Sequence, residues 1–71
     1  MDDFRRCGAH EIVLPDGTRL HQAVVETEAG RVVNYYEFHD ELPMTEWLGG
    51  EIRLERDEEG ILRAIWQGKK I

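Results

Sequence analysis

Apolar and polar side chains alternate along most of the chain, in short segments separated by turn sequences. The turns are marked by Pro15-Asp16-Gly17, Glu28-Ala29-Gly30, Gly49-Gly50 and Asp57-Glu58-Glu59-Gly60. The segments between them are rich in Val, Ile, Tyr and Thr, whose branched or flat side chains pack well on a pleated surface. Regularly spaced turns between such segments predict an all-β chain. We expect a small five-stranded antiparallel meander, sandwich or open barrel of hairpins, with strands over about 7–14, 18–28, 31–39, 51–56 and 61–67.

The first two strands are predicted to form a hairpin through Pro15-Asp16-Gly17. Proline fixes φ at the first central position, aspartate can accept a bond from the backbone of the turn, and glycine supplies a positive φ. Alternation along the first strand places His10 and Ile12 on one face and Ala9 on the other. The second strand is apolar on both faces around 23–25, which predicts cover on both sides and a bulge or bend.

The third strand is also apolar on both faces. Val32, Tyr36 and Phe38 share one face, and Val33 and Tyr35 share the other. A sheet with one solvated face would not need this pattern. We therefore expect the second face to be covered, either by a sheet curled on itself or by another subunit.

The last two strands form the most regular of the predicted hairpins. The fourth strand places Ile52 and Leu54 inward, between charged residues that face water. The fifth strand places Leu62, Ala64 and Trp66 inward. A turn rich in acidic residues joins the two strands and ends on a glycine, as is typical of a hairpin.

Residues 40–50 form the least regular segment of the chain. Pro43 suits the first position of a helical turn, but few residues remain before Gly49-Gly50, so the segment is either an irregular connection with a single helical turn or a short strand. We expect Trp47 to anchor this connection against the sheet. Residues 1–6 are expected to form a loose N-terminal lead to a single domain that spans 1–71.

Length and charge limit the classes of function. A domain of 71 residues buries only roughly 60 % of the surface that its unfolded chain exposes, so a partner surface would add to its stability. Nine basic residues stand against fifteen acidic ones, and adjacent basic pairs occur only near the two termini, so we expect no nucleic-acid partner. Because no apolar run exceeds three residues, we expect no membrane partner and a cytoplasmic location.

The sequence holds no recognisable catalytic or metal-binding motif. Cys7 is a single thiol and can form neither an internal disulfide nor a thiolate pair. His10, His21 and His39 are separated by eleven and eighteen residues, which is not the spacing of a metal motif. A hairpin would bring His10 near His21, and surface histidines remain the preferred interpretation. The chain has no serine and no glycine-rich phosphate loop. We therefore expect no catalytic residue, no metal and no cofactor, and we favour a protein without enzymatic activity.

Aromatic residues are concentrated in the third strand and in the irregular connection. Tyr35 and Tyr36 are adjacent and must point to opposite faces of the strand, so at least one ring meets a second layer or a partner. Both possibilities stay open. We expect a homodimer, with interface residues Val33, Tyr35, Tyr36 and Trp47. Pairing through an exposed strand edge offers a second route to the same assembly.

Three segments carry a resemblance to a known family: Ile12-Val13-Leu14-Pro15-Asp16-Gly17-Thr18, Ala23-Val24-Val25-Glu26 and Gly30-Arg31-Val32-Val33. They resemble the opening strands of metal-dependent hydrolases of the amidohydrolase superfamily. In that superfamily the pattern builds the composite domain, a small β sandwich beside a catalytic (β/α)₈ barrel. The resemblance covers about 7–33 and ends before the family's His-x-His metal motif, which this chain lacks. None of the family's metal or catalytic residues therefore has a counterpart here.

Two functions follow as hypotheses. The first is a structural or accessory role, as a freestanding relative of the composite domain. The second is a homo-oligomeric protein–protein interaction module that is unrelated to hydrolases. A composite-type fold predicts a sandwich whose first three strands form a meander, whereas a generic module predicts one barrel-like sheet.

Overall fold

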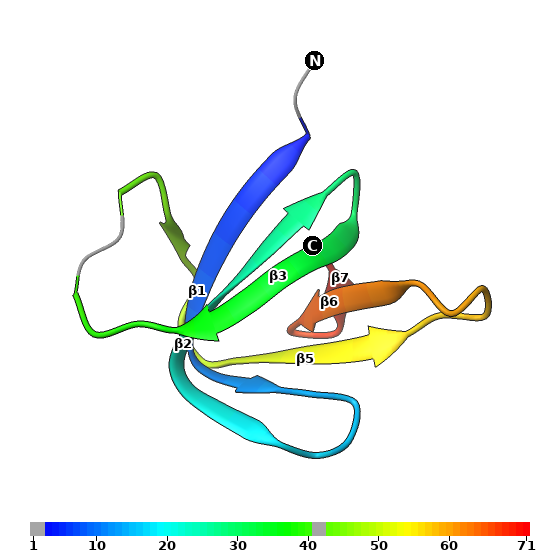
Figure 1. The fold of residues 1–71 in the computed structure, drawn as a ribbon, viewed down its shortest axis with the longest axis horizontal. Coiled ribbons are helices and arrows are strands. Elements are labelled where there is room, and N and C mark those ends of the chain that lie inside the picture. Colours follow the sequence, from blue (N-terminus) through cyan, green and yellow to red (C-terminus); the bar gives the residue numbers. More distant parts are fainter. Residues whose placement is uncertain (1–2, 41–42) are drawn as a thin grey trace.

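The computed structural model describes residues 3–40 and 43–71, and in these ranges the chain forms a single β-sheet (Figure 1). The all-β prediction is confirmed. The sheet has seven strands rather than five, because two-residue strands add to it in the connection and at the C-terminus. The strands are β1 (Phe4–Val13), β2 (Arg19–Glu28), β3 (Arg31–Glu37), β4 (Glu46–Trp47), β5 (Glu51–Arg56), β6 (Leu62–Trp66) and β7 (Lys69–Lys70).

The strand order is β3-β2-β1-β5-β6-β7, with β4 also paired to β1. The first three strands form an antiparallel meander, and the last three form a second one. The two meanders are joined by parallel pairing of β1 with β5, in which Ile12 lies opposite Ile52. The expectation of a wholly antiparallel sheet is therefore wrong. The reason is the long connection after β3, which returns the chain to the free side of β1 in the direction of β1 itself.

The predicted turns close the predicted hairpins. In the first, the Gly17 N–H donates to the carbonyl of Leu14, and the Thr18 N–H donates to Asp16 Oδ1. The second turn uses Ala29 and Gly30, both with positive φ, which is the backbone of a type I′ hairpin turn. The type I′ geometry matches the twist of the two strands that it joins.

The β1–β2 hairpin bends in its middle, and this bend overturns the face assignment made from alternation. Ala9 pairs with Ala23 and Glu11 pairs with His21, but the ladder is interrupted between them, where Gln22 takes a φ of 50°. Ala9 and Ile12 consequently both lie in the core, although regular alternation would separate them. His10 stays exposed and does not share the buried face of Ile12.

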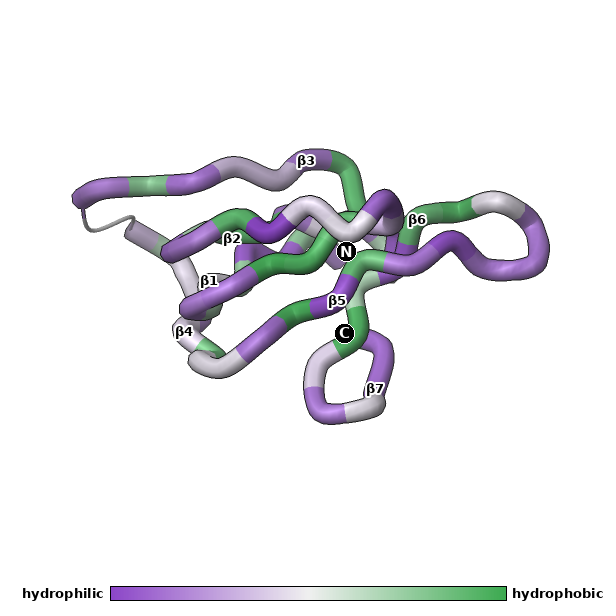
Figure 2. The backbone as a smooth tube through the Cα atoms, turned by 90° about the horizontal axis from the view of Figure 1, so that it is seen from below, coloured by the Kyte–Doolittle hydropathy of each residue, from purple (hydrophilic) through white to green (hydrophobic). Residues whose placement is uncertain are grey.

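The core occupies the inner face of the curled sheet. Fully buried Ile12, Ile52 and Leu54 fill its centre. Small buried side chains complete the cluster, namely Cys7, Ala9, Ala23 and Ala64. Partly buried Leu62 and Trp66 complete it, as expected for the last hairpin. Figure 2 shows hydrophobic stretches in β1, β5 and β6 and a hydrophilic tip on the β5–β6 hairpin.

Arg63 holds the curled sheet together across its open side. Its Nη1 donates to the carbonyl of Gly30 at 2.8 Å, and its Nε donates to Asp57 Oδ2 at 2.9 Å. The guanidinium thus joins β6 and the β5–β6 turn to the tip of the β2–β3 hairpin. The curl covers part of the inner face of β3: Val32 packs against the core, whereas Tyr35, opposite the core residue Val25, stays exposed. The expectation of a sheet curled on itself therefore accounts for only part of the apolar pattern of β3.

The two segments expected to be irregular are largely paired. Residues 4–6, assigned from sequence to the loose N-terminal lead, lie in β1 opposite Glu26, Thr27 and Glu28; residues 1–2 lie outside the described residues. In the connection, residues 43–50 contain no helical turn, and 46–47 form β4 parallel to β1. The predicted irregular connection over 40–50 also includes 41–42, which lie outside the described residues. Nowhere in the described chain is there a helix long and apolar enough to cross a membrane.

Candidate functional site

The four residues expected at an interface lie on two different surfaces. Tyr35 is opposite the core residue Val25, and Tyr36 is opposite Val24 on the outer face of the sheet. Val33, Tyr35 and Trp47 are 54 %, 38 % and 50 % exposed. Tyr36 is half-buried. The structure therefore leaves Val33 and Tyr35 exposed on β3, and it places Tyr36 with Trp47 on the outer face.

The outer face carries an aromatic cluster, made of His10, Phe38 and Trp47. The Trp47 ring meets His10 edge-on at 5.1 Å between ring centroids and Phe38 edge-on at 6.2 Å. Beneath the ring lies Gly8, where a Cβ atom would come within 2.9 Å of Trp47 Cε3. Glycine at this position therefore lets the indole lie directly on the backbone of β1. Sequence reasoning missed this role, because Gly8 has no turn signature around it.

Residues 43–49 form a strap that carries Trp47 across the sheet. Arg5 Nε and Nη2 donate to the two carboxylate oxygens of Glu46, at 3.0 and 2.8 Å, and Arg6 Nη1 donates to the carbonyl of Pro43. The N–H groups of residues 48 and 49 both donate to the carbonyl of Gly8. The Arg5 guanidinium lowers the pKa of the Glu46 carboxyl, and the same bond raises the pKa of Arg5. The strap is thus tied to β1 by backbone and charged contacts at once.

A second polar network lies beside the aromatic cluster. The Tyr36 hydroxyl donates to Glu26 Oε2 at 2.7 Å, and Arg6 Nε donates to the same oxygen at 2.9 Å. The hydroxyl bond lowers the pKa of Glu26 and raises the pKa of Tyr36, because it is strongest when the carboxyl is ionised and the phenol is neutral. The arrangement fixes the Tyr36 ring, and the Glu26 carboxylate accepts from both Tyr36 and Arg6. It orients side chains and gives Tyr36 little freedom to reach a partner.

Side-chain oxygens on β3 accept hydrogen bonds from backbone N–H groups. The Tyr35 N–H donates to Oδ1 of the preceding residue, Asn34, at 2.9 Å. The register between β2 and β3 shifts between Glu26 and Thr27, so that Val33 has no residue opposite it. Glu37 Oε2 accepts the His21 N–H at 3.0 Å, and Arg31 is exposed at the other end of the strand.

The side chains considered as nucleophiles or metal ligands do not form a common site. Cys7 is buried, and burial raises the pKa of its thiol, which opposes nucleophilic use. His21 Nδ1 lies 3.6 Å from Glu11 Oε2, and Glu11 is bound by Arg19 at 2.6 Å. Across residues 3–40 and 43–71, no three His, Cys, Asp or Glu residues come together as a group that could hold a metal ion. The expectation that no metal or cofactor binds stays a prediction.

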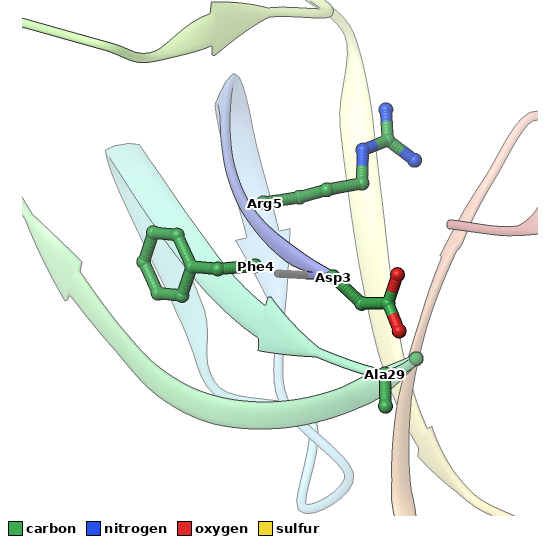
Figure 3. A pocket seen from close by; sticks show the side chains of 5 residues that line it. Asp3, Phe4, Arg5 and Ala29 are labelled. Atoms are coloured by element: carbon green, nitrogen blue, oxygen red, sulfur yellow. The ribbon is translucent and has the colours of Figure 1, made fainter. Parts of the chain in front are cut away.

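Two surface hollows lie away from these residues. The larger, about 630 Å³, is lined by Asp3, Phe4, Arg5, Ala29 and Gly30 (Figure 3). Figure 3 shows the Asp3 and Arg5 side chains diverging, while Phe4 projects from the other side of β1. The smaller, about 300 Å³, lies among charged residues next to the β5–β6 turn. Neither gathers side chains into an arrangement for acid–base or nucleophilic chemistry.

Comparison with known proteins adds no relative. No family model matches the chain, and neither a curated protein nor a solved structure matches it.

Proposed function

We propose that this chain is a protein–protein interaction module that acts as a homodimer. The observation that carries the proposal is the exposure of Val33 and Tyr35 on β3, the terminal strand of the sheet order. Apolar side chains on a terminal strand are suited to contact with another chain, because both side chains and backbone can take part. A dimer would also cover surface that so small a core leaves exposed.

The domain exposes enough surface for a stable dimer interface. A stable interface covers about 800 Å² on each partner. The chain exposes 4847 Å² in total, so such an interface would take roughly one sixth of it. The exposed residues of β3, Val33 and Tyr35 among them, offer part of that area.

A second candidate is the structural or accessory role of a composite-type domain. It is supported by the meander of β1, β2 and β3, which is the arrangement that the resemblance implies. Against it stands the single curled sheet, since a composite-type domain was expected to form a sandwich. The balance of these two observations favours the interaction module.

Light scattering coupled to gel filtration tests the proposal. We expect the measured mass to rise toward twice the 8.3 kDa chain mass as concentration increases through the micromolar range. A constant mass of one chain up to millimolar concentration, with a cooperative thermal melt, would contradict the homodimer. That result would leave the accessory role as the better candidate.

A further inference from the structure

The strap is attached to β1 by far fewer backbone contacts than the long strands are to one another. Its ladder with β1 is two residue pairs long, whereas β1 and β2 share nine (Figure 1). Beyond the ladder, the N–H groups of Leu48 and Gly49 donate to the same acceptor, the Gly8 carbonyl, at 2.9 and 3.4 Å. A segment held by few bonds opens at a smaller cost in free energy than the whole fold.

The side-chain contacts of the strap lie at the surface. Arg5 and Glu46 form a bidentate ion pair whose side chains are 40 % and 51 % exposed. Exposed ion pairs add little to stability, because water competes for both charges. The Trp47 ring is half-exposed, so its packing contributes less than that of a fully buried ring. The strap is therefore closed by contacts that are individually weak.

The C-terminal end of the strap is fixed and forms a hinge. The Gly49 carbonyl accepts from Trp66 Nε1 at 3.0 Å, and the Gly50 carbonyl accepts the Glu11 N–H at 3.1 Å. These bonds hold the base of the strap to β6 and β1. Both glycines take positive φ, 75° and 63°, and glycine changes its backbone conformation at little steric cost. Residues 43–48 can therefore move about a fixed base.

Cys7 lies beside the strap and reports on its position. Its side chain is fully buried, and Cys7 pairs with Glu46 of β4. Burial raises the pKa of the thiol, and the charges of Arg5 and Glu46 also act on it, which places this ion pair close to the sulfur. Leu48 packs against the core cluster that contains Cys7. Opening of the strap moves Glu46 and Leu48 away together, which admits water to the thiol.

We propose that the strap is a gate: residues 43–48 move away from β1 about Gly49 and Gly50 while the rest of the sheet stays folded, and the Arg5–Glu46 pair holds the gate closed. The open form uncovers the Cys7 thiol and the part of the β1 edge that β4 pairs with. Opening requires no second copy, so the gate is independent of the homodimer.

Labelling of Cys7 with dithionitrobenzoate tests the gate, because Cys7 is the single thiol of the chain. The labelling rate of the folded protein, divided by that of the unfolded chain in urea at the same pH, gives the opening constant. We expect this constant to exceed the global unfolding constant, measured by urea denaturation, by about tenfold or more. The amides of Leu48 and Gly49 should exchange hydrogen with the same opening constant.

Two variants separate gate opening from global unfolding. Glu46→Gln removes the charge of the ion pair at constant size and should raise the opening constant about two- to fivefold. Leu54→Val is the control, since it shortens a fully buried side chain of β5. It should raise the global unfolding constant about two- to tenfold and leave the labelling rate of Cys7 unchanged.

The outcomes decide between a gate and a uniformly closed fold. Labelling at the global unfolding constant, accelerated by Leu54→Val in proportion to its loss of stability, would overturn the gate. An opening constant of Glu46→Gln equal to that of the wild-type protein would overturn the role of the Arg5–Glu46 pair, provided that circular dichroism shows the variant to be folded.

Discussion

Placing an alanine at Gly8 is expected to disturb the contact between the strap and the sheet. Its Cβ would lie 2.9 Å from Cε3 and 3.1 Å from Cζ3 of Trp47, and 3.5 Å from Cγ2 of Thr45. The first two distances are too short for carbon atoms, so the indole must move outward. The backbone of Gly8 itself lies in the regular β1 ladder, where alanine is tolerated.

The expected cost follows from three contributions. Overpacking of this kind costs about 1 to 3 kcal/mol, and weakening of the edge-on contacts with His10 and Phe38 costs about 0.5 to 1.5 kcal/mol. Alanine offsets about 0.5 to 1 kcal/mol of this loss, because it restricts the unfolded chain more than glycine does. Because half of the ring is exposed and can yield, we expect a net loss of about 1 to 2 kcal/mol in the free energy of unfolding.

A double-mutant cycle separates this contact from other effects of the substitution. Urea denaturation is measured for Gly8→Ala, Trp47→Ala and the double variant, with circular dichroism as the probe. In the Trp47→Ala background the alanine has no ring to meet, so Gly8→Ala should be neutral or slightly stabilising there. The coupling between the two sites should therefore reach about 1 to 2 kcal/mol. Additive effects would refute the packing of the indole on the Gly8 backbone.

Three further predictions concern the closure of the sheet, acid stability and metal ions. Arg63→Ala removes the bonds to the Gly30 carbonyl and to Asp57, and should lower the free energy of unfolding by about 2 kcal/mol, whereas an unchanged urea midpoint would show that the sheet stays curled without them. The pKa values of Glu26, Glu46 and Asp57 are lowered, chiefly by bonds from Tyr36, from Arg5 and from the Ile61 N–H respectively. The stability that these carboxylates contribute is present above their ordinary pKa values and is lost as the pH falls through the lowered ones, so melting temperatures should drop with acidification. Glu46→Gln should flatten part of that drop, and an identical pH profile would show that the Arg5 contact contributes nothing. Thermal melts with and without a chelator should coincide, and a lower melting temperature in the chelator would reveal a metal requirement.

Local signals in the sequence predict the hairpins of this fold well. The Pro15-Asp16-Gly17 turn and the alternation of Ile52 with Leu54 each depend on neighbours in the chain, and the structure confirms both. The parallel pairing of Ile12 with Ile52 joins residues forty positions apart, and no local periodicity encodes it. A bulge or bend was predicted around 23–25, but its position at Gln22 was not, because glutamine rarely takes a positive φ and carries no turn signature.

The candidate site was foreseen only in part. The opposite orientation of Tyr35 and Tyr36 follows from the period of a strand, and the register with Val25 and Val24 agrees with it. The position of Trp47 over Gly8 depends on the path of the strap, which alternation does not determine. The bond from Tyr36 to Glu26 depends on the register of two strands, and a register cannot be set from composition.

Cross-linking on β3 tests the central claim, the homodimer, most directly. Asn34 is exposed between Val33 and Tyr35, the residues proposed to contact the second copy, so a cysteine at this position lies within the proposed dimer contact. Asn34→Cys should therefore form a covalent dimer rapidly under mild oxidation at micromolar concentration. Glu55→Cys, on an exposed position of β5, is the matched control, and the native Cys7 is buried. Rapid cross-linking of Asn34→Cys alone is the result that the β3 homodimer predicts, and cross-linking no faster than that of Glu55→Cys would contradict it.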